Sequence, residues 1–269
     1  MEKFKFNMIG GGFQHDVCSC ANNTPKHVEW IKQNHFASVS IHIDAAIFNV
    51  PVDKNKLNIG WFCESPYFTR PYSQKCDNFD IKSWVLENYK FIFTSDKEII
   101  KKHPEFKYVI PHAYSWIQDR QIFKKTKTTS IIASAKKECP GHILRHIIVD
   151  NYKDSIAAFG GGYNPIKFKE EGLSDYMFSF AIENTKCDGY FTEKITDCFS
   201  TGTIPIYWGD STISDYFLTD GIISLEDEFD GSCLTKEFYD SKLDIIKENF
   251  DRSMNLPIPE DYIYINYIK

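Results

Sequence analysis

A segment near residue 190 of this 269-residue chain brings together side chains that could hold a phosphate group. An apolar run of strand length ends in Glu183 and Asn184, and Thr192 stands where a helix N-cap is expected. Lys194 then falls in the first helical turn, where the helix dipole disfavours a cation. A bound diphosphate would make the lysine favourable at this position, because the backbone N–H groups, the helix dipole and the ammonium would all attract the same anion. The segment therefore predicts a nucleotide-sugar phosphate site.

A structural role for Lys194 is the alternative. Glu193 and Asp197 are close enough in sequence to pair with it on a solvated helix surface. Exposed first-turn lysines of this kind are common and contribute little. The helix alone leaves both interpretations open.

The spacing of these residues resembles the signature of the glycosyltransferase family 10 α1,3/4-fucosyltransferases. The matching residues are Glu183, Asn184, Tyr190, Thr192, Glu193, Lys194, Gly202 and the run Ile204-Pro205-Ile206-Tyr207-Trp208-Gly209. More than a dozen positions at fixed spacing make a far more specific signal than a lone glycine motif. The resemblance extends upstream to about Ser130. It implies an α/β protein of GT-B type, with two Rossmann-like domains facing across a cleft.

The resemblance also implies roles for individual residues. Arg145 and Lys194 would pair with the donor diphosphate. Independently of the resemblance, Ser134 ends the predicted strand before the helix of Arg145 and could add a hydroxyl to the phosphates. The other residues expected at the donor site are Asn184, Tyr190, Thr192 and Glu193. A carboxylate can accept both hydroxyls of a sugar, an amide can orient a hydroxyl, and a tyrosine can stack on a ring. Glu193 is expected to affect both donor affinity and rate. Arg145 as a surface residue and Ser134 as a turn residue are the alternatives.

Transfer with inversion also needs a base that takes the proton of the acceptor hydroxyl. Glu64 directly follows a predicted strand, and its Glu-Ser-Pro context is similar to the base-bearing motif of animal-type members of the family. A loop glutamate without a chemical role is the alternative, and Asp44 and Glu87 are the other candidate bases.

Composition excludes several classes of protein. A net charge of -6 and a pI near 5.8 argue against a nucleic-acid partner. No stretch approaches the roughly twenty apolar residues of a membrane span, and the first residues lack a signal-peptide core. We therefore expect a cytoplasmic protein of the soluble bacterial or viral type, with its eight cysteines as free thiols.

No cofactor or metal is expected to be required. The cluster His15, Asp16, Cys18 and Cys20 lacks a second ligand pair at zinc-site spacing. The donor half has no Asp-x-Asp motif that would hold a divalent ion against a diphosphate. Side chains would then supply the positive charge.

Alternating strand and helix patterns predict two α/β domains. The first half has strands predicted at 3–9, 38–43, 57–62, 91–94 and 108–110, with helices at 26–34 and from 95. The polar stretch 120–130 is the candidate linker, which gives an acceptor-side domain 1–122 and a donor-binding domain 123–269. The second half has strands predicted at 130–134, 155–159, 176–182 and 204–208, and helices from Pro140, from Thr192 and at 235–254.

Two details of the second half bear on the site. The helix from Pro140 is expected to turn Ile143, Leu144, Ile147 and Ile148 inward, with Arg145 at the edge of that face. The tail after Pro257 could lead back to the first domain.

These expectations together describe an inverting fucosyltransferase. It would move fucose from GDP-fucose to a hydroxyl of a glycan acceptor, with an α1,3 linkage. A family member that uses another nucleotide-sugar, and a non-catalytic glycan- or nucleotide-binding protein of the same fold, are the alternatives.

Overall fold

The computed structural model describes residues 2–11, 17–32, 37–111, 113–226 and 229–269, and the chain divides into two compact units. The first unit comprises Met1–His112, Cys187–Tyr190 and Pro257–Lys269, and the second comprises Ala113–Lys186 and Phe191–Leu256. The division therefore falls ten residues before the predicted boundary after residue 122. The last residues belong to the first unit because Glu260 accepts a hydrogen bond from the backbone N–H of Ser19 over 2.6 Å, and Asp261 accepts one from that of Lys26 over 2.7 Å.

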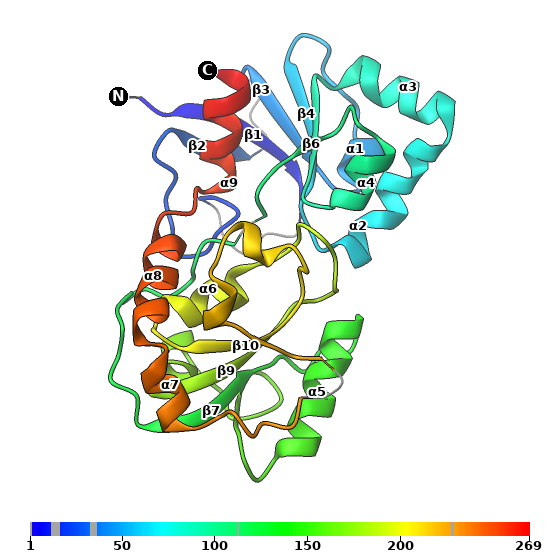
Figure 1. Ribbon diagram of the computed structural model, residues 1–269. Helices are drawn as coiled ribbons and strands as arrows, with labels where there is room; N and C mark the ends of the chain where they lie inside the picture. The colour runs from blue at the N-terminus through cyan, green and yellow to red at the C-terminus, as the bar shows by residue number, and fades with distance from the viewer. Residues whose placement is uncertain (1, 12–16, 33–36, 112, 227–228) are drawn as a thin grey trace. The chain divides into compact units, whose positions relative to one another are not determined.

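A six-stranded parallel sheet forms the centre of the first unit (Figure 1). Its strands, in the order β2-β1-β3-β4-β5-β6, are β2 (Val28–Lys32), β1 (Phe4–Gly10), β3 (Val39–Ile43), β4 (Leu57–Phe62), β5 (Phe91–Thr94) and β6 (Lys107–Tyr108). The predicted helix at 26–34 is wrong, because 28–32 is an edge strand. Val28 and Trp30 are buried while Glu29 and Ile31 are half-buried, which is the alternation of a strand.

Helices cover one face of this sheet and the C-terminal segment covers the other. The helices are α1 (Ala46–Asn49), α2 (Pro66–Ser73), α3 (Phe79–Asn88) and α4 (Lys97–Lys102), with the 3-10 turn η1 (Gln74–Asp77). Ile47, Val85 and Ile99 bring α1, α3 and α4 into one apolar cluster with β4 and β5. The helix α9 (Pro259–Ile263) and the π-helical turn η5 (Tyr264–Ile268) lie against the strands, with the ring of Tyr267 4.9 Å from that of Phe93.

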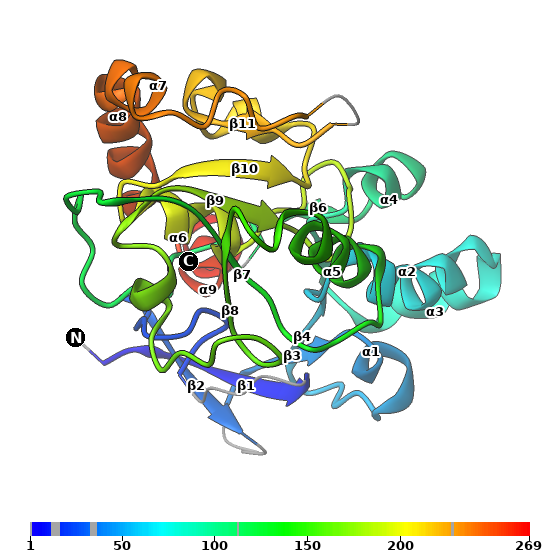
Figure 2. The ribbon, with the colours of Figure 1, turned by 90° about the horizontal axis from the view of Figure 1, so that it is seen from below.

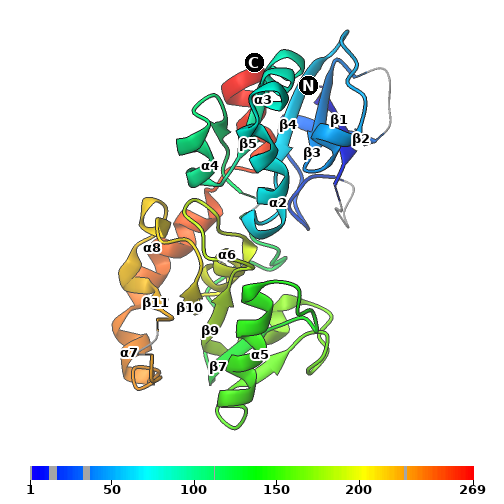
Figure 3. The same cartoon turned by 90° about the vertical axis from the view of Figure 1, so that its right-hand side faces the viewer.

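A five-stranded parallel sheet forms the second unit, and Figure 2 shows its central strands side by side. In the order β11-β10-β9-β7-β8, the strands are β11 (Ile223–Ser224), β10 (Ile204–Trp208), β9 (Tyr176–Ile182), β7 (Lys127–Ile132) and β8 (Ala157–Phe159). The helices are α5 (Pro140–Tyr152), α6 (Glu193–Phe199), α7 (Lys236–Ser241) and α8 (Leu243–Met254), with the 3-10 turns η2 (Lys169–Gly172), η3 (Ile213–Asp215) and η4 (Thr219–Gly221). Figure 3 shows α5 on one side of the strands and α7 and α8 on the other. Two units with parallel sheets confirm the α/β class.

The buried face of α5 differs from the predicted one. Ile143 and Ile147 are 50% and 47% exposed, whereas Arg145 is only 6% exposed. The apolar pattern misleads because Arg145 is buried through hydrogen bonds: its Nε and Nη2 donate to the carbonyl oxygen of Ile182 over 3.1 and 2.5 Å. The predicted helix at 235–254 is likewise two helices, separated at Lys242.

Part of the predicted linker is anchored to the second unit. The ammonium of Lys125 donates to the carbonyl oxygens of Ser174 and Thr201 over 3.0 and 2.7 Å and to the hydroxyl of Thr203 over 2.9 Å. These bonds fix the chain before β7. Among the described residues, no helix has the length and apolar character needed to cross a lipid bilayer.

Candidate functional site

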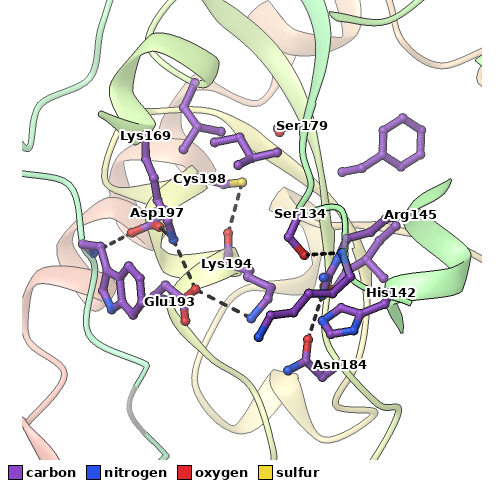
Figure 4. A pocket seen from close by; sticks show the side chains of 16 residues that line it. Ser134, His142, Arg145, Lys169, Ser179, Asn184, Glu193, Lys194, Asp197 and Cys198 are labelled. Carbon is purple, nitrogen blue, oxygen red and sulfur yellow. Dashed lines mark hydrogen bonds and ion pairs between the residues drawn. The ribbon is translucent and has the colours of Figure 1, made fainter. Parts of the chain in front are cut away.

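A cavity of about 370 Å³ opens in the second unit, within reach of the carboxyl ends of β7 and β9. This is the edge at which parallel α/β sheets bind ligands. Four cationic side chains and two carboxylates are among the residues that line it: Lys136, Arg145, Lys169, Lys194, Glu193 and Asp197. Ser134, His142 and Asn184 also contribute, and Figure 4 shows them on one side with Lys169 and Asp197 opposite and Lys194 between. The excess of cations suits a small anionic ligand.

Arg145 joins the wall of the cavity to the end of β9. Besides the carbonyl oxygen of Ile182, its Nη2 contacts the side-chain oxygen of Asn184 over 3.0 Å. These contacts hold the planar guanidinium in one orientation, which is the property that suits arginine to phosphate recognition. The predicted donor residues Arg145 and Asn184 thus lie together.

Glu183 fixes the start of α6. Its two carboxylate oxygens accept hydrogen bonds from the backbone N–H and the hydroxyl of Thr192, each over 2.7 Å, and the residue is fully buried. Thr192 occupies the predicted N-cap position, but its side chain does not cap the helix. A Cβ on Gly141 would overlap the carbonyl oxygen of Glu183, so only glycine allows α5 to begin this close to β9.

Lys194 extends from α6 into the cavity while paired with its neighbours. Its ammonium donates to the hydroxyl of Thr192 over 2.8 Å and lies 3.3 Å from the carboxylate of Glu183 and 3.6 Å from that of Glu193. The ion pair with Glu193 is the one that the structural alternative predicted. The lysine also lines the cavity, so it combines an ion pair to Glu193 with the position expected of a phosphate ligand.

Lys169, on η2, lies on the opposite wall between two carboxylates. Its ammonium is 3.1 Å from Glu193 and 2.6 Å from Asp197, and it lies 4.3 Å from the centre of the Trp116 ring. Burial opposes the charge, but Asp197 and Glu193 outweigh it and raise the pKa of Lys169. Asp197 also accepts hydrogen bonds from the hydroxyl of Ser115 over 2.9 Å and the backbone N–H of Trp116 over 2.7 Å. Glu193 is therefore held between two lysines at the cavity.

The remaining predicted donor residues are less closely gathered. Ser134 lines the cavity, and its hydroxyl accepts a long hydrogen bond of 3.4 Å from the backbone N–H of Lys136. Tyr190 is buried in the segment Cys187–Tyr190, which belongs to the first unit, and is not among the residues that line this cavity.

The first unit has a separate cavity of about 430 Å³, and Glu64 and Asp44 both line it. Asp44 follows β3 and Glu64 follows β4, two neighbouring parallel strands, so their carboxylates meet at one edge of the sheet. Glu64 is exposed and accepts a hydrogen bond from the backbone N–H of Ser65 over 2.7 Å. The third candidate, Glu87, lies on the exposed side of α3 and does not line this cavity.

Asp44 differs from Glu64 in its surroundings. Its backbone has a φ of 50°, a conformation that aspartate tolerates better than most residues. Its carboxylate accepts a hydrogen bond from the backbone N–H of Cys63 over 2.8 Å. Burial nevertheless raises the pKa of Asp44 to about 7.

The cysteines and the candidate metal ligands were also compared with the predictions from sequence. The eight cysteines are free thiols. His15 and Asp16 of the candidate metal cluster lie outside the described residues, and Cys18 and Cys20 are buried. In the part of the chain that the structure describes, no three His, Cys, Asp or Glu side chains are arranged to hold a metal ion.

The sequence of the second unit matches a known family model. Residues 122–237 match the model described as glycosyltransferase family 10 (fucosyltransferase), C-terminal part. This stretch contains the cavity residues from Ile132 to Cys198 and every residue of the matching pattern, which confirms the resemblance.

Individual relatives are similar to part of this chain over part of their own length. An alpha-(1,3)-fucosyltransferase FucT of Helicobacter pylori is 33% identical over 129 residues, which is 45% of this chain and 26% of the relative. A GDP-fucose protein O-fucosyltransferase 3 of Bos taurus is 34% identical over 70 residues, 24% of this chain and 15% of the relative. A crystal structure of an alpha1,3-fucosyltransferase aligns with 86% of this chain and 74% of its own, at 18% identity and a TM-score of 0.49. This chain thus spans about a quarter or less of the length of these curated relatives.

Sequence reasoning missed His142, Lys169 and Asp197 as cavity residues. Two of them carried a usable signal: His142 precedes Arg145 by three residues, and Asp197 follows Glu193 by four, so each pair shares one helix face. Lys169 carried none, because it reaches the cavity from η2, far from the motif in sequence.

Proposed function

We propose that this chain is a glycosyltransferase that transfers fucose from GDP-fucose to a hydroxyl of an acceptor. The observation that carries the proposal is the cavity in the family 10 stretch, where four cationic side chains face two carboxylates. A nucleotide diphosphate brings negative charge that this excess of cations can balance. The GDP-fucose named for the Bos taurus relative supports guanosine diphosphate as the carrier.

The transfer we propose inverts the anomeric centre. The acceptor hydroxyl oxygen bonds to the anomeric carbon of β-linked fucose while the bond from that carbon to the phosphate oxygen breaks, which gives an α linkage. Arg145 and Lys194 stabilise the negative charge that the departing diphosphate gains. Glu64 accepts the proton of the acceptor hydroxyl, and Glu193, held between Lys169 and Lys194, contacts the donor sugar or ribose.

We further propose a glycan as the acceptor, with an α1,3 linkage in line with the Helicobacter pylori relative. The Bos taurus relative acts on proteins by its name, so peptide acceptors belong in the same test. Metal is not required for the chemistry, because side chains supply the positive charge.

A donor panel tests this function. GDP-fucose, GDP-mannose and UDP sugars are each offered with a mixed glycan array and a peptide set, with and without excess EDTA. We expect transfer from GDP-fucose to a glycan, unchanged by EDTA. Transfer from another donor would reassign the sugar, and tight GDP binding without any transfer would identify a binding protein.

A further inference from the structure

His142 lies on the cavity wall with one ring nitrogen already engaged. It is the third residue of α5, it is 7% exposed, and its Nδ1 accepts a hydrogen bond from the backbone N–H of Glu138 over 3.3 Å. A ring nitrogen that accepts a hydrogen bond carries no proton, so the proton of the neutral ring lies on Nε2. The opposite edge of the ring is then a hydrogen-bond donor at a cavity suited to an anion.

The charges around this ring favour its neutral form. Burial lowers the pKa of His142, and Arg145 on the same helix acts in the same direction. Lys136, on the loop before α5, and Lys194, on α6, also lower it, whereas Glu138 opposes them. The start of a helix further disfavours an imidazolium.

The nearby carboxylates are engaged elsewhere. Glu183, at the end of β9, accepts from Thr192 and lies 3.3 Å from Lys194. Glu193, on α6, lies 3.1 Å from Lys169. Cations therefore dominate the field at the ring, and protonation at Nδ1 would also break the hydrogen bond from Glu138.

We propose that His142 is a further ligand of the donor diphosphate, to which it donates Nε2–H as a neutral imidazole. This inference rests on the proposed function of the cavity. Arg145 and Lys194 supply the charge, while His142 supplies a directed hydrogen bond from a ring whose Nδ1 is already engaged by the backbone N–H of Glu138. Figure 4 shows His142 beside Arg145 and Asn184, on the wall that we assign to the phosphates.

Nitrogen NMR of the intact protein tests the protonation state directly. Long-range ¹H–¹⁵N correlations of the ring, assigned with His142→Gln, are recorded between pH 6 and pH 8 with and without GDP-fucose. We expect a protonated Nε2 and an unprotonated Nδ1 at pH 8, in the free protein and in the complex, with the Nε2–H resonance moving when GDP-fucose binds. An imidazolium or the opposite tautomer in the complex would overturn the proposal.

Calorimetry with GDP-fucose tests the contact. His142→Leu should weaken binding by roughly 10- to 100-fold, the range for one hydrogen bond to a charged group. His142→Gln keeps an N–H donor of similar reach and should recover most of that loss. The matched control is His146→Gln, one turn further along α5, where the ring contacts Tyr163 and the carbonyl of Lys136.

The outcomes separate two failures. If GDP-fucose does not bind the wild-type protein, the proposed function is wrong. If it binds the wild type and His142→Leu equally, only the role of His142 is wrong.

Discussion

The two carboxylate oxygens of Glu183 accept hydrogen bonds from the backbone N–H and the hydroxyl of Thr192, each over 2.7 Å. This pair joins the end of β9 to the start of α6 and fixes the position from which Lys194 reaches the cavity. A buried carboxylate with two hydrogen bonds and a cation at 3.3 Å is satisfied within the protein. Glu183 is therefore a positioning residue, which holds Thr192 and Lys194 at the start of α6.

Replacing Lys194 with Ala should weaken GDP binding by about 1.5 to 3 kcal/mol, because one charge-assisted hydrogen bond to the diphosphate is lost. Titration calorimetry measures the change. Lys186→Ala is the matched control, since Lys186 is an exposed lysine of the preceding loop that pairs with Glu226. Equal GDP affinity in wild type and Lys194→Ala would remove Lys194 from the phosphate site.

Gly141→Ala should destabilise the second unit by about 1 to 3 kcal/mol, the range for a methyl group forced into a packed region. Its Cβ would overlap the carbonyl oxygen of Glu183, so α5 and its Arg145 would have to shift. Gly161→Ala is the control, because nothing lies within 4 Å of a Cβ at that position. Chemical denaturation of the two variants decides the matter, and equal stability would mean that α5 does not need this close approach.

Features that depend on neighbouring residues could be predicted from the sequence, whereas features that depend on residues distant in sequence could not. The bounds of β4, β5, β9 and β10 agree with the predicted strands, because each is an apolar run bounded by turn residues. The predicted inward face of α5 was wrong because Arg145 is buried through hydrogen bonds to β9, and a pattern of apolar residues does not reveal such bonds. Lys169 was missed for a related reason: its partners Glu193 and Asp197 are more than twenty residues away.

The stability of the first unit should fall as pH rises from about 4.5 to 7. Burial raises the pKa of Glu260 from 4.5 to about 7, so the folded state binds more protons than the unfolded state in this window. The stabilisation is complete below pH 4.5 and is lost through pH 7, by about 3 kcal/mol at most. Asp44, whose pKa burial raises from 3.8 to about 7, adds a slope of the same sign.

Denaturation at pH 5 and pH 8 measures this slope. Glu260→Gln should flatten it, with the part due to Asp44 remaining. A slope that is the same in wild type and Glu260→Gln would show that Glu260 is ionised throughout.

Glu64→Gln should reduce the rate of transfer by roughly 10² to 10⁴, because the amide cannot accept a proton, while donor binding hardly changes. Asp44→Asn is the companion variant, since asparagine tolerates the φ of 50° at this position. If Asp44 were the base, its raised pKa would make the rate climb with pH through about 7, and Asp44→Asn would abolish that climb. Near-normal turnover of Glu64→Gln would exclude Glu64 as the base.

The most direct test of the donor site is a crystal structure of the protein with GDP-fucose. The site described here predicts the diphosphate in the cavity of the second unit, with its oxygens within hydrogen-bond distance of Arg145 and Lys194. GDP-fucose bound at another surface, or in this cavity with its diphosphate away from both side chains, would contradict the assignment.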